Sequence, residues 1–226
     1  MKKISALLVL VICAVFAFAQ AGGNTDSSYA NGYYVERVKY FAQLKAPEKA
    51  IIFLGNSITE AGEWQEVLPG KKVINRGISG DNSFGVYARL DALLTLKPAK
   101  VFLLIGINDL KRGTPLEVIL NNYRKIIGKI KKDAPKTTLY LQSVLPVAES
   151  VIPAIYAKIT NEKVKELNKG IKELADSNHL TYIDLYNDVF VSNQGQLKIE
   201  FTTDGLHLKA AAYIIWAKYL QDKKYL

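Results

Sequence analysis

The sequence predicts an α/β protein in three layers, with a parallel sheet lying between two layers of helices. Short segments that are apolar throughout alternate along the chain with longer segments whose apolar residues recur at helical spacing. Strands of this kind are typical of a parallel sheet that helices cover on both faces. The 226 residues are 49% hydrophobic and 23% charged. This composition is usual for a globular domain and excludes disordered and collagen-like chains.

Each expected strand is short and ends close to residues that favour turns. The segment 50–54 is wholly apolar and is followed by Gly55, and 100–105 is the second strong run of this type. Ligands of such sheets bind beyond the carboxyl ends of the strands, so the residues that follow these segments are the candidates for a site. The expected strands are 50–54, 72–74, 100–105, 137–143 and 180–185.

The expected helices lie between these strands and at the two ends of the domain. For one of them the start is well marked, because Thr114 is a good cap, Pro115 fits the first turn and Glu117 completes a capping box. The expected helices are 33–44, 58–67, 83–96, 114–132, 160–177 and 209–220.

The first residues are typical of a secretory signal peptide. Lys2 and Lys3 precede an uncharged apolar run over 4–19, and small residues follow it. We expect a signal peptide over 1–21, a flexible leader over 22–31 and one domain over 32–226. The protein is then exported, to the periplasm or the medium, and is not stably inserted in a membrane after cleavage. Cys13 is the only cysteine, so the exported chain lacks disulfides, thiolate metal sites and a cysteine nucleophile.

The net charge of +9 does not indicate a nucleic-acid partner. Most of the basic residues are lysines spread along the expected helices, with no arginine-rich tract interleaved with aromatic residues. We therefore interpret the charge as a solvated basic surface.

Polar residues follow three of the expected strands. Ser57 lies at a tight turn between a strand and a helix, where a serine is exposed and close to a helix N-terminus. Gly80 lies in a loop where paired glycines allow close approach of the backbone, and its N–H is a candidate donor to an oxyanion. Asn108 offers a side-chain N–H₂ donor for the same purpose. Taken singly, these residues are more often part of a helix cap or a turn.

A carboxylate and an imidazole lie close together near the end of the chain. Asp204 precedes His207 by three residues, and an aspartate in this place can hold a histidine by its Nδ1–H and support the imidazolium. Together with the residues after the strands, they supply a nucleophile, a base, an orienting acid and two oxyanion donors. This set predicts nucleophilic acyl transfer.

Four blocks, in this order, resemble the SGNH/GDSL hydrolase family: Gly-Asn-Ser-Ile, Asn-Arg-Gly-Ile-Ser-Gly-Asp, Gly-Ile-Asn-Asp and Asp-Gly-Leu-His. The resemblance covers about residues 50–220 and implies a flavodoxin-like sandwich with about five parallel strands. It makes Ser57 the nucleophile, with Asp204 and His207 as acid and base. It places the oxyanion between Ser57, Gly80 and Asn108. The most similar branch contains small esterases near platelet-activating-factor acetylhydrolase.

One residue departs from the family pattern, because Asn56 stands where Asp usually precedes the serine. An asparagine can keep the hydrogen bonds of the turn, but it removes a negative charge beside the nucleophile. This departure keeps open a second hypothesis, a glycan-binding module of the same fold with weak catalysis.

The resulting expectation is a secreted serine esterase acting on acetyl or other short esters of carbohydrates or small molecules. A lipid acylhydrolase of the lysophospholipase or thioesterase type is the alternative, since the apolar segment 144–159 follows a strand and is a candidate border of the acyl pocket. An α/β-hydrolase would need a second glycine where Thr59 stands. No cofactor or metal is expected, because two histidines do not build a usual zinc site. The oligomeric state stays open.

Overall fold

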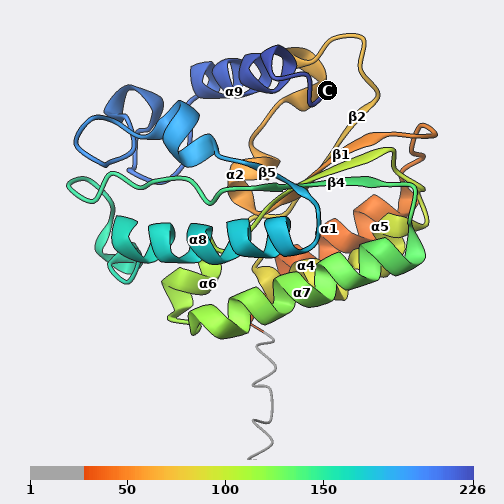
Figure 1. Cartoon of the computed structure of the whole chain (residues 1–226), viewed down its shortest axis with the longest axis horizontal. Helices are drawn as coiled ribbons and strands as arrows, with labels where there is room; N and C mark the ends of the chain where they lie inside the picture. The colour runs from red at the N-terminus through yellow and green to blue at the C-terminus, as the bar shows by residue number, and fades with distance from the viewer. Residues whose placement is uncertain (1–27) are drawn as a thin grey trace, which may run out of the picture.

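The computed structural model describes residues 28–226 and contains a five-stranded parallel sheet with helices on both faces (Figure 1). The order of strands across the sheet is β2-β1-β3-β4-β5, which is the flavodoxin-like order. The predicted fold class is therefore confirmed. The strands are β1 (Ile51–Gly55), β2 (Val73–Gly77), β3 (Lys100–Leu104), β4 (Thr138–Gln142) and β5 (Thr181–Ile183).

Helices α2, α3 and α9 cover one face of the sheet, and α1 and α4 to α8 cover the other (Figure 1). Short 3₁₀ turns at Ala154–Tyr156 and Ile199–Phe201 and a π turn at Tyr186–Phe190 lie in the connections. The helices are α1 (Gly32–Gln43), α2 (Ser57–Glu60), α3 (Trp64–Val67), α4 (Ser83–Ala88), α5 (Leu90–Leu94), α6 (Ile107–Arg112), α7 (Leu116–Asp133), α8 (Asn161–Ser177) and α9 (Ala210–Asp222).

The signal peptide expected over 1–21, with Cys13, lies outside the described residues, as does most of the leader expected over 22–31. The end of the leader packs on the domain. The ring of Tyr29 lies edge-on to Tyr34 at 4.9 Å, and Asn31 caps α1 by accepting a hydrogen bond from the Tyr34 N–H.

Strand β2 is longer than the apolar pattern predicts. The polar residues Asn75 and Arg76 were expected after the strand, yet they pair with Phe53 and Leu54 of β1. The Asn75 amide donates to two carbonyls at the end of α2 and to one in the turn that follows it, at 2.9–3.1 Å. Because neighbouring side chains in a strand point to opposite faces, Arg76 points toward α1 and α5. Hydrogen bonding therefore satisfies Asn75, a polar residue that hydrophobicity alone would exclude from the sheet.

Two of the expected helices are each interrupted and form two shorter helices, and a third begins later than expected. The segment 58–67 forms α2 and α3, and 83–96 forms α4 and α5, which meet at Arg89. The predicted Thr114 cap is wrong, since α7 begins at Leu116 with no side-chain cap. The Thr114 N–H instead donates to the Asp109 carbonyl and closes the end of α6, where Gly113 takes a left-handed conformation.

The core under α3 and α9 is built from stacked aromatic rings. Phe53, Phe102 and Tyr140 lie at one level of three adjacent strands, with ring centroids 5.0 and 4.6 Å apart. Trp64 stacks on Phe53 at 3.8 Å and meets Trp216 of α9 edge-on at 4.9 Å. This ladder holds the two helices on the sheet.

We expect Phe102→Ala to lower the free energy of unfolding by about 3–5 kcal/mol, because it opens a cavity in the middle of a fully buried ladder. Urea denaturation measures the difference. The matched control is Ile214→Ala on α9, whose side chain is 60% exposed and whose loss should change stability by about 0.5 kcal/mol or less. Equal effects of the two substitutions would contradict this account of the core.

Candidate active site

Three of the predicted site residues lie at the carboxyl ends of adjacent strands. Ser57 begins α2 after β1, Gly80 lies between β2 and α4, and Asn108 is the second residue of α6 after β3. Strand β1 lies between β2 and β3 in the sheet, so these residues share one edge. This edge includes the β1/β3 switch point, where ligands bind in sheets of this order.

The loop before α9 brings a histidine to the serine. Ser57 Oγ lies 3.0 Å from His207 Nε2, and His207 Nδ1 lies 2.6 Å from Asp204 Oδ2. Burial acts to raise the pKa of Asp204, but hydrogen bonds from the His207 ring and from the N–H groups of His207 and Leu206 outweigh it and lower the pKa. The carboxylate therefore stays ionised and can orient the imidazole.

The loop that carries this pair is pinned by Thr202. Its hydroxyl donates to the His207 carbonyl at 2.7 Å and accepts from the Gly205 N–H at 2.9 Å. Gly205 has a φ of +80°, and a Cβ there would lie 2.8 Å from the Ala148 carbonyl oxygen. Position 205 thus requires a glycine, both for its positive φ and because a side chain would clash with Ala148. The glycine allows the loop to pack closely against the segment that follows β4.

Each of the predicted oxyanion donors keeps at least one N–H hydrogen that no group among the described residues accepts. In the part of the chain that the structure describes, the N–H groups of Ser57 and Gly80 donate no hydrogen bond to the protein. Asn108 Nδ2 donates one hydrogen to the Asp81 carbonyl at 2.8 Å, which leaves its second hydrogen for another acceptor. Gly80 has a φ of +82°, which explains the glycine at this position.

Arg112 joins the Gly80 loop to helix α6, which carries Asn108, and the sequence did not predict this role. Its guanidinium donates to the carbonyls of Asn108 and Gly80, each at 3.2 Å. Arg112 follows Asn108 by four residues, which places both on one face of a helix, and this spacing could have predicted the contact. Arg112 thereby fixes the distance between Gly80 and Asn108.

A buried network of hydrogen bonds holds Asp109, the residue that follows Asn108 in α6. The Asp109 carboxylate accepts the Ser83 N–H at 3.0 Å and its hydroxyl at 2.6 Å, and Asn122 donates to that hydroxyl. Burial raises the pKa of Asp109 to about 7, and the hydrogen bonds from Ser83 act against this shift. These partners come from α4 and α7, so no local pattern could have predicted them.

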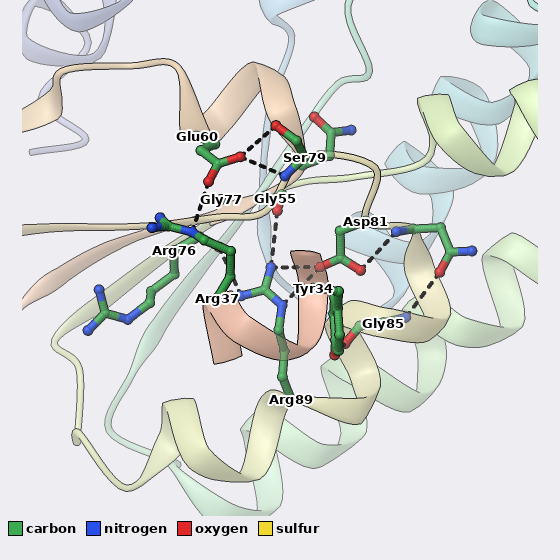
Figure 2. A network of polar contacts seen from close by, with 12 residues as sticks. Tyr34, Arg37, Gly55, Glu60, Arg76, Gly77, Ser79, Asp81, Gly85 and Arg89 are labelled. Carbon is green, nitrogen blue, oxygen red and sulfur yellow. Dashed lines mark hydrogen bonds and ion pairs between the residues drawn. The ribbon is translucent and has the colours of Figure 1, made fainter. Parts of the chain in front are cut away.

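A carboxylate clamp lies on the other side of the Gly80 loop (Figure 2). Glu60 Oε2 accepts the Ser79 N–H at 2.7 Å and the Ser79 hydroxyl at 2.5 Å. Glu60 Oε1 accepts the Tyr33 hydroxyl at 2.6 Å and lies 3.0 Å from Arg37 Nε. Helix α1 therefore helps to hold the residue that immediately precedes Gly80.

The segment 144–159 divides into two parts. Val144, Leu145, Val147 and Ala148 are 0–2% exposed and pack in the core, while Val151 and Ile155 are exposed. The side chains of Asn161 and Asn168 form hydrogen bonds with the backbone N–H and C=O groups of the buried part.

Among the described residues, no group of three or more His, Cys, Asp or Glu could hold a metal ion. No helix among them is long and apolar enough to cross a membrane.

The buried Asp109 carboxyl predicts a pH effect on stability. An unfolded aspartate has a pKa of about 3.9. The folded state therefore holds this proton more tightly between about pH 4 and pH 7, and the contribution of Asp109 to stability falls as the pH rises through that window. We expect Asp109→Asn to gain stability relative to the unmodified protein as the pH rises from about 4 to about 7.

Urea denaturation at several pH values measures this difference, and effects of other groups cancel in it. Asp222→Asn is the control, because it removes the carboxyl of an exposed side chain that pairs only with Lys218 in the described chain. A flat or falling difference for Asp109→Asn would show that this carboxyl is ionised throughout the range.

A family model described as the GDSL-like lipase/acylhydrolase family matches residues 53–215. Among solved structures, a Streptococcus pneumonia protein provisionally described as a platelet activating factor is 35% identical, covering 84% of this chain and 90% of that one at a TM-score of 0.76. A GDSL-like lipase from Bacteroides thetaiotaomicron is 26% identical, covering 85% and 98% at a TM-score of 0.72. The acetylxylan esterase Axe2 of Geobacillus stearothermophilus, 19% identical over 78% and 94% with a TM-score of 0.60, shares the fold.

Two curated proteins match shorter stretches. The N-acylneuraminate cytidylyltransferase of Streptococcus agalactiae is 27% identical over 54% of this chain, and the match spans only 27% of that enzyme's length. The arylesterase of Vibrio mimicus is 33% identical over 46% of this chain and 59% of its own length. The family model covers well over half of the sequence. The chain therefore belongs to the GDSL-like lipase/acylhydrolase family, as its four sequence blocks predicted, and its enzyme class is that of the serine hydrolases of ester bonds.

Proposed function

We propose that the chain is an exported serine esterase that removes acetyl or other short acyl groups from carbohydrates or small molecules. The observation that carries the chemistry is the hydrogen-bonded chain from Ser57 through His207 to Asp204. Export is supported by the basic start and apolar run of the first 21 residues.

In this mechanism His207 Nε2 takes the Ser57 proton as Oγ attacks the ester carbonyl. Asp204 holds the ring through Nδ1 and stabilises the imidazolium. The N–H groups of Ser57 and Gly80 and the free hydrogen of Asn108 Nδ2 donate to the oxyanion. The imidazolium then protonates the leaving alcohol, and water, deprotonated by His207, hydrolyses the acyl-enzyme.

Two observations support a short acyl group on a sugar. The apolar residues 144, 145, 147 and 148 pack in the core, so they add to stability and do not extend an acyl channel. One matched curated protein is named for N-acylneuraminate, an acylated sugar acid, and another is named an arylesterase. The acyl group in the first name is an amide, so that name supports only a sugar, while the second name fits small esters better than long-chain lipids.

Asn56 does not disturb this geometry, which argues against the binding-module alternative. Its Oδ1 caps α2 by accepting the Ile58 N–H at 3.0 Å, so the turn that presents Ser57 keeps its side-chain hydrogen bond.

Hydrolysis of p-nitrophenyl esters from acetate to laurate tests the proposal. We expect Ser57-dependent cleavage with the highest kcat/KM on acetate, a loss of about 10⁴-fold or more in kcat for Ser57→Ala, and a loss of roughly 10²–10³-fold for Asn108→Ala. Ser177→Ala, an exposed serine at the end of α8, is the control and should keep full activity. Unchanged hydrolysis by Ser57→Ala would refute the assignment of the nucleophile.

The acyl profile separates the remaining alternatives. A maximum at long chains would indicate a lipid acylhydrolase. No cleavage of any ester, together with saturable glycan binding, would indicate a binding module.

The Glu60 clamp gives a separate prediction about positioning. Glu60 does not contact the reacting atoms, but it fixes Ser79 and through it the N–H of Gly80. We expect Glu60→Gln to lower kcat on p-nitrophenyl acetate by about tenfold with little change in KM, since charge-assisted bonds of about 1.5–3 kcal/mol are weakened. Glu117→Gln, which alters an exposed pair with Arg124, should change neither constant. A rise in KM alone would assign Glu60 to substrate binding.

A further inference from the structure

A cavity of about 280 Å³ lies between α1, β2 and α5, on the sheet face opposite to α2 and α3. Ligand sites in proteins start at about 300 Å³, so this one suits a small ligand. Its walls are mostly aliphatic and aromatic, and two arginines are its only charged residues. The main lining residues are Val38, Phe41, Leu93, Leu96, Arg76 and Arg89.

Arg76 is deeply buried, yet no carboxylate pairs with it. The residue is 5% exposed, and among the described residues it forms no ion pair. Its Nη1 donates to the Asn75 carbonyl at 2.9 Å, and its Cζ lies 4.5 Å from the centroid of the Phe41 ring. A guanidinium carries five N–H donors, so most of its capacity is unused. Buried charges are normally paired, which makes this arrangement unusual.

The neighbouring arginines differ from Arg76 in this respect (Figure 2). Arg89 pairs with Asp81 at 2.9 Å and donates to the carbonyls of Arg76 and Gly55, and Arg37 pairs with Glu60. The cluster therefore holds three cations and two carboxylates. Burial is the main cause that lowers the pKa of Arg76 to about 10, and the charges of Arg89 and Arg37 add to this effect. Arg76 therefore remains a cation at neutral pH. An anion at Arg76 would balance the cluster.

We propose that this cavity binds a small amphipathic monocarboxylate, whose carboxylate pairs with Arg76 and whose short hydrocarbon chain lies against the apolar wall. A carboxylate matches the guanidinium with two parallel hydrogen bonds. An inorganic anion such as phosphate would leave the apolar wall unused and would bury more charge. The site is separate from Ser57 and does not depend on the proposed esterase activity.

Calorimetric titration of the Ser57→Ala protein with sodium hexanoate tests this site. Hexan-1-ol, hexylammonium and inorganic phosphate are the comparison ligands. We expect saturable binding of hexanoate, and weaker binding of the other three. Arg76→Gln should weaken hexanoate binding by about 10- to 100-fold, as expected for the loss of a charge-assisted pair.

A second variant keeps the test valid if Arg76→Gln folds poorly. Ala92→Phe fills the cavity from its exposed rim on α5 and leaves Arg76 in place, so it should abolish hexanoate binding. Arg124→Gln, an exposed arginine of α7, is the matched control and should bind as the parent does. Absence of saturable hexanoate binding, binding that survives both cavity variants, or equal binding of phosphate would each overturn the proposal.

Discussion

The carboxyl edge of the sheet depends on the buried ion pair between Arg89 and Asp81. Arg89 also donates to the carbonyls of Gly55 and Arg76, so one guanidinium connects the ends of β1 and β2 to the loop that carries Gly80. Burial raises the pKa of Asp81 to about 6, against the lowering effect of Arg89. A buried pair of this kind adds little net stability. Its contribution here is to hold three separate chain segments in one arrangement.

Around this pair, the loop that carries Gly80 and the Asn108 side chain are each held from two sides. Glu60 holds Ser79 on one side of the Gly80 loop, and Arg112 holds the Gly80 carbonyl on the other. Asn108 is held by the Asp81 carbonyl and by the buried network of hydrogen bonds that holds Asp109. The donors are therefore positioned before any ligand arrives, which is the condition under which hydrogen bonds to a developing charge are most effective.

The sequence predicted the features that depend on local pattern. Wholly apolar strands, helical spacing and the order of the four blocks predicted the sheet, and residues 57, 204 and 207 were expected at one place, where the structure brings them together. The errors share a cause. Asn75 lies inside β2 because carbonyls of α2 accept its amide hydrogens, and Arg76 lies there with its guanidinium against the Phe41 ring of α1. The Thr114 N–H is used by the preceding helix. Glu60, Arg89 and Ser83 each have a partner that lies 19, 34 and 26 residues away in the chain, respectively, and no local spacing shows such pairs.

The asparagine before Ser57 changes the electrostatics of the site more than its geometry. Asn56 is fully buried, and its Nδ2 has no hydrogen-bond partner in the described structure, while Oδ1 makes the capping bond. An aspartate in the same place would cap α2 equally well but would bury a negative charge at a fully buried position. The amide avoids that cost and leaves its N–H₂ group unsatisfied, which itself costs about 1–3 kcal/mol. Because Ser57 still lies 3.0 Å from His207, the departure from the family pattern alters the field around the serine without displacing it.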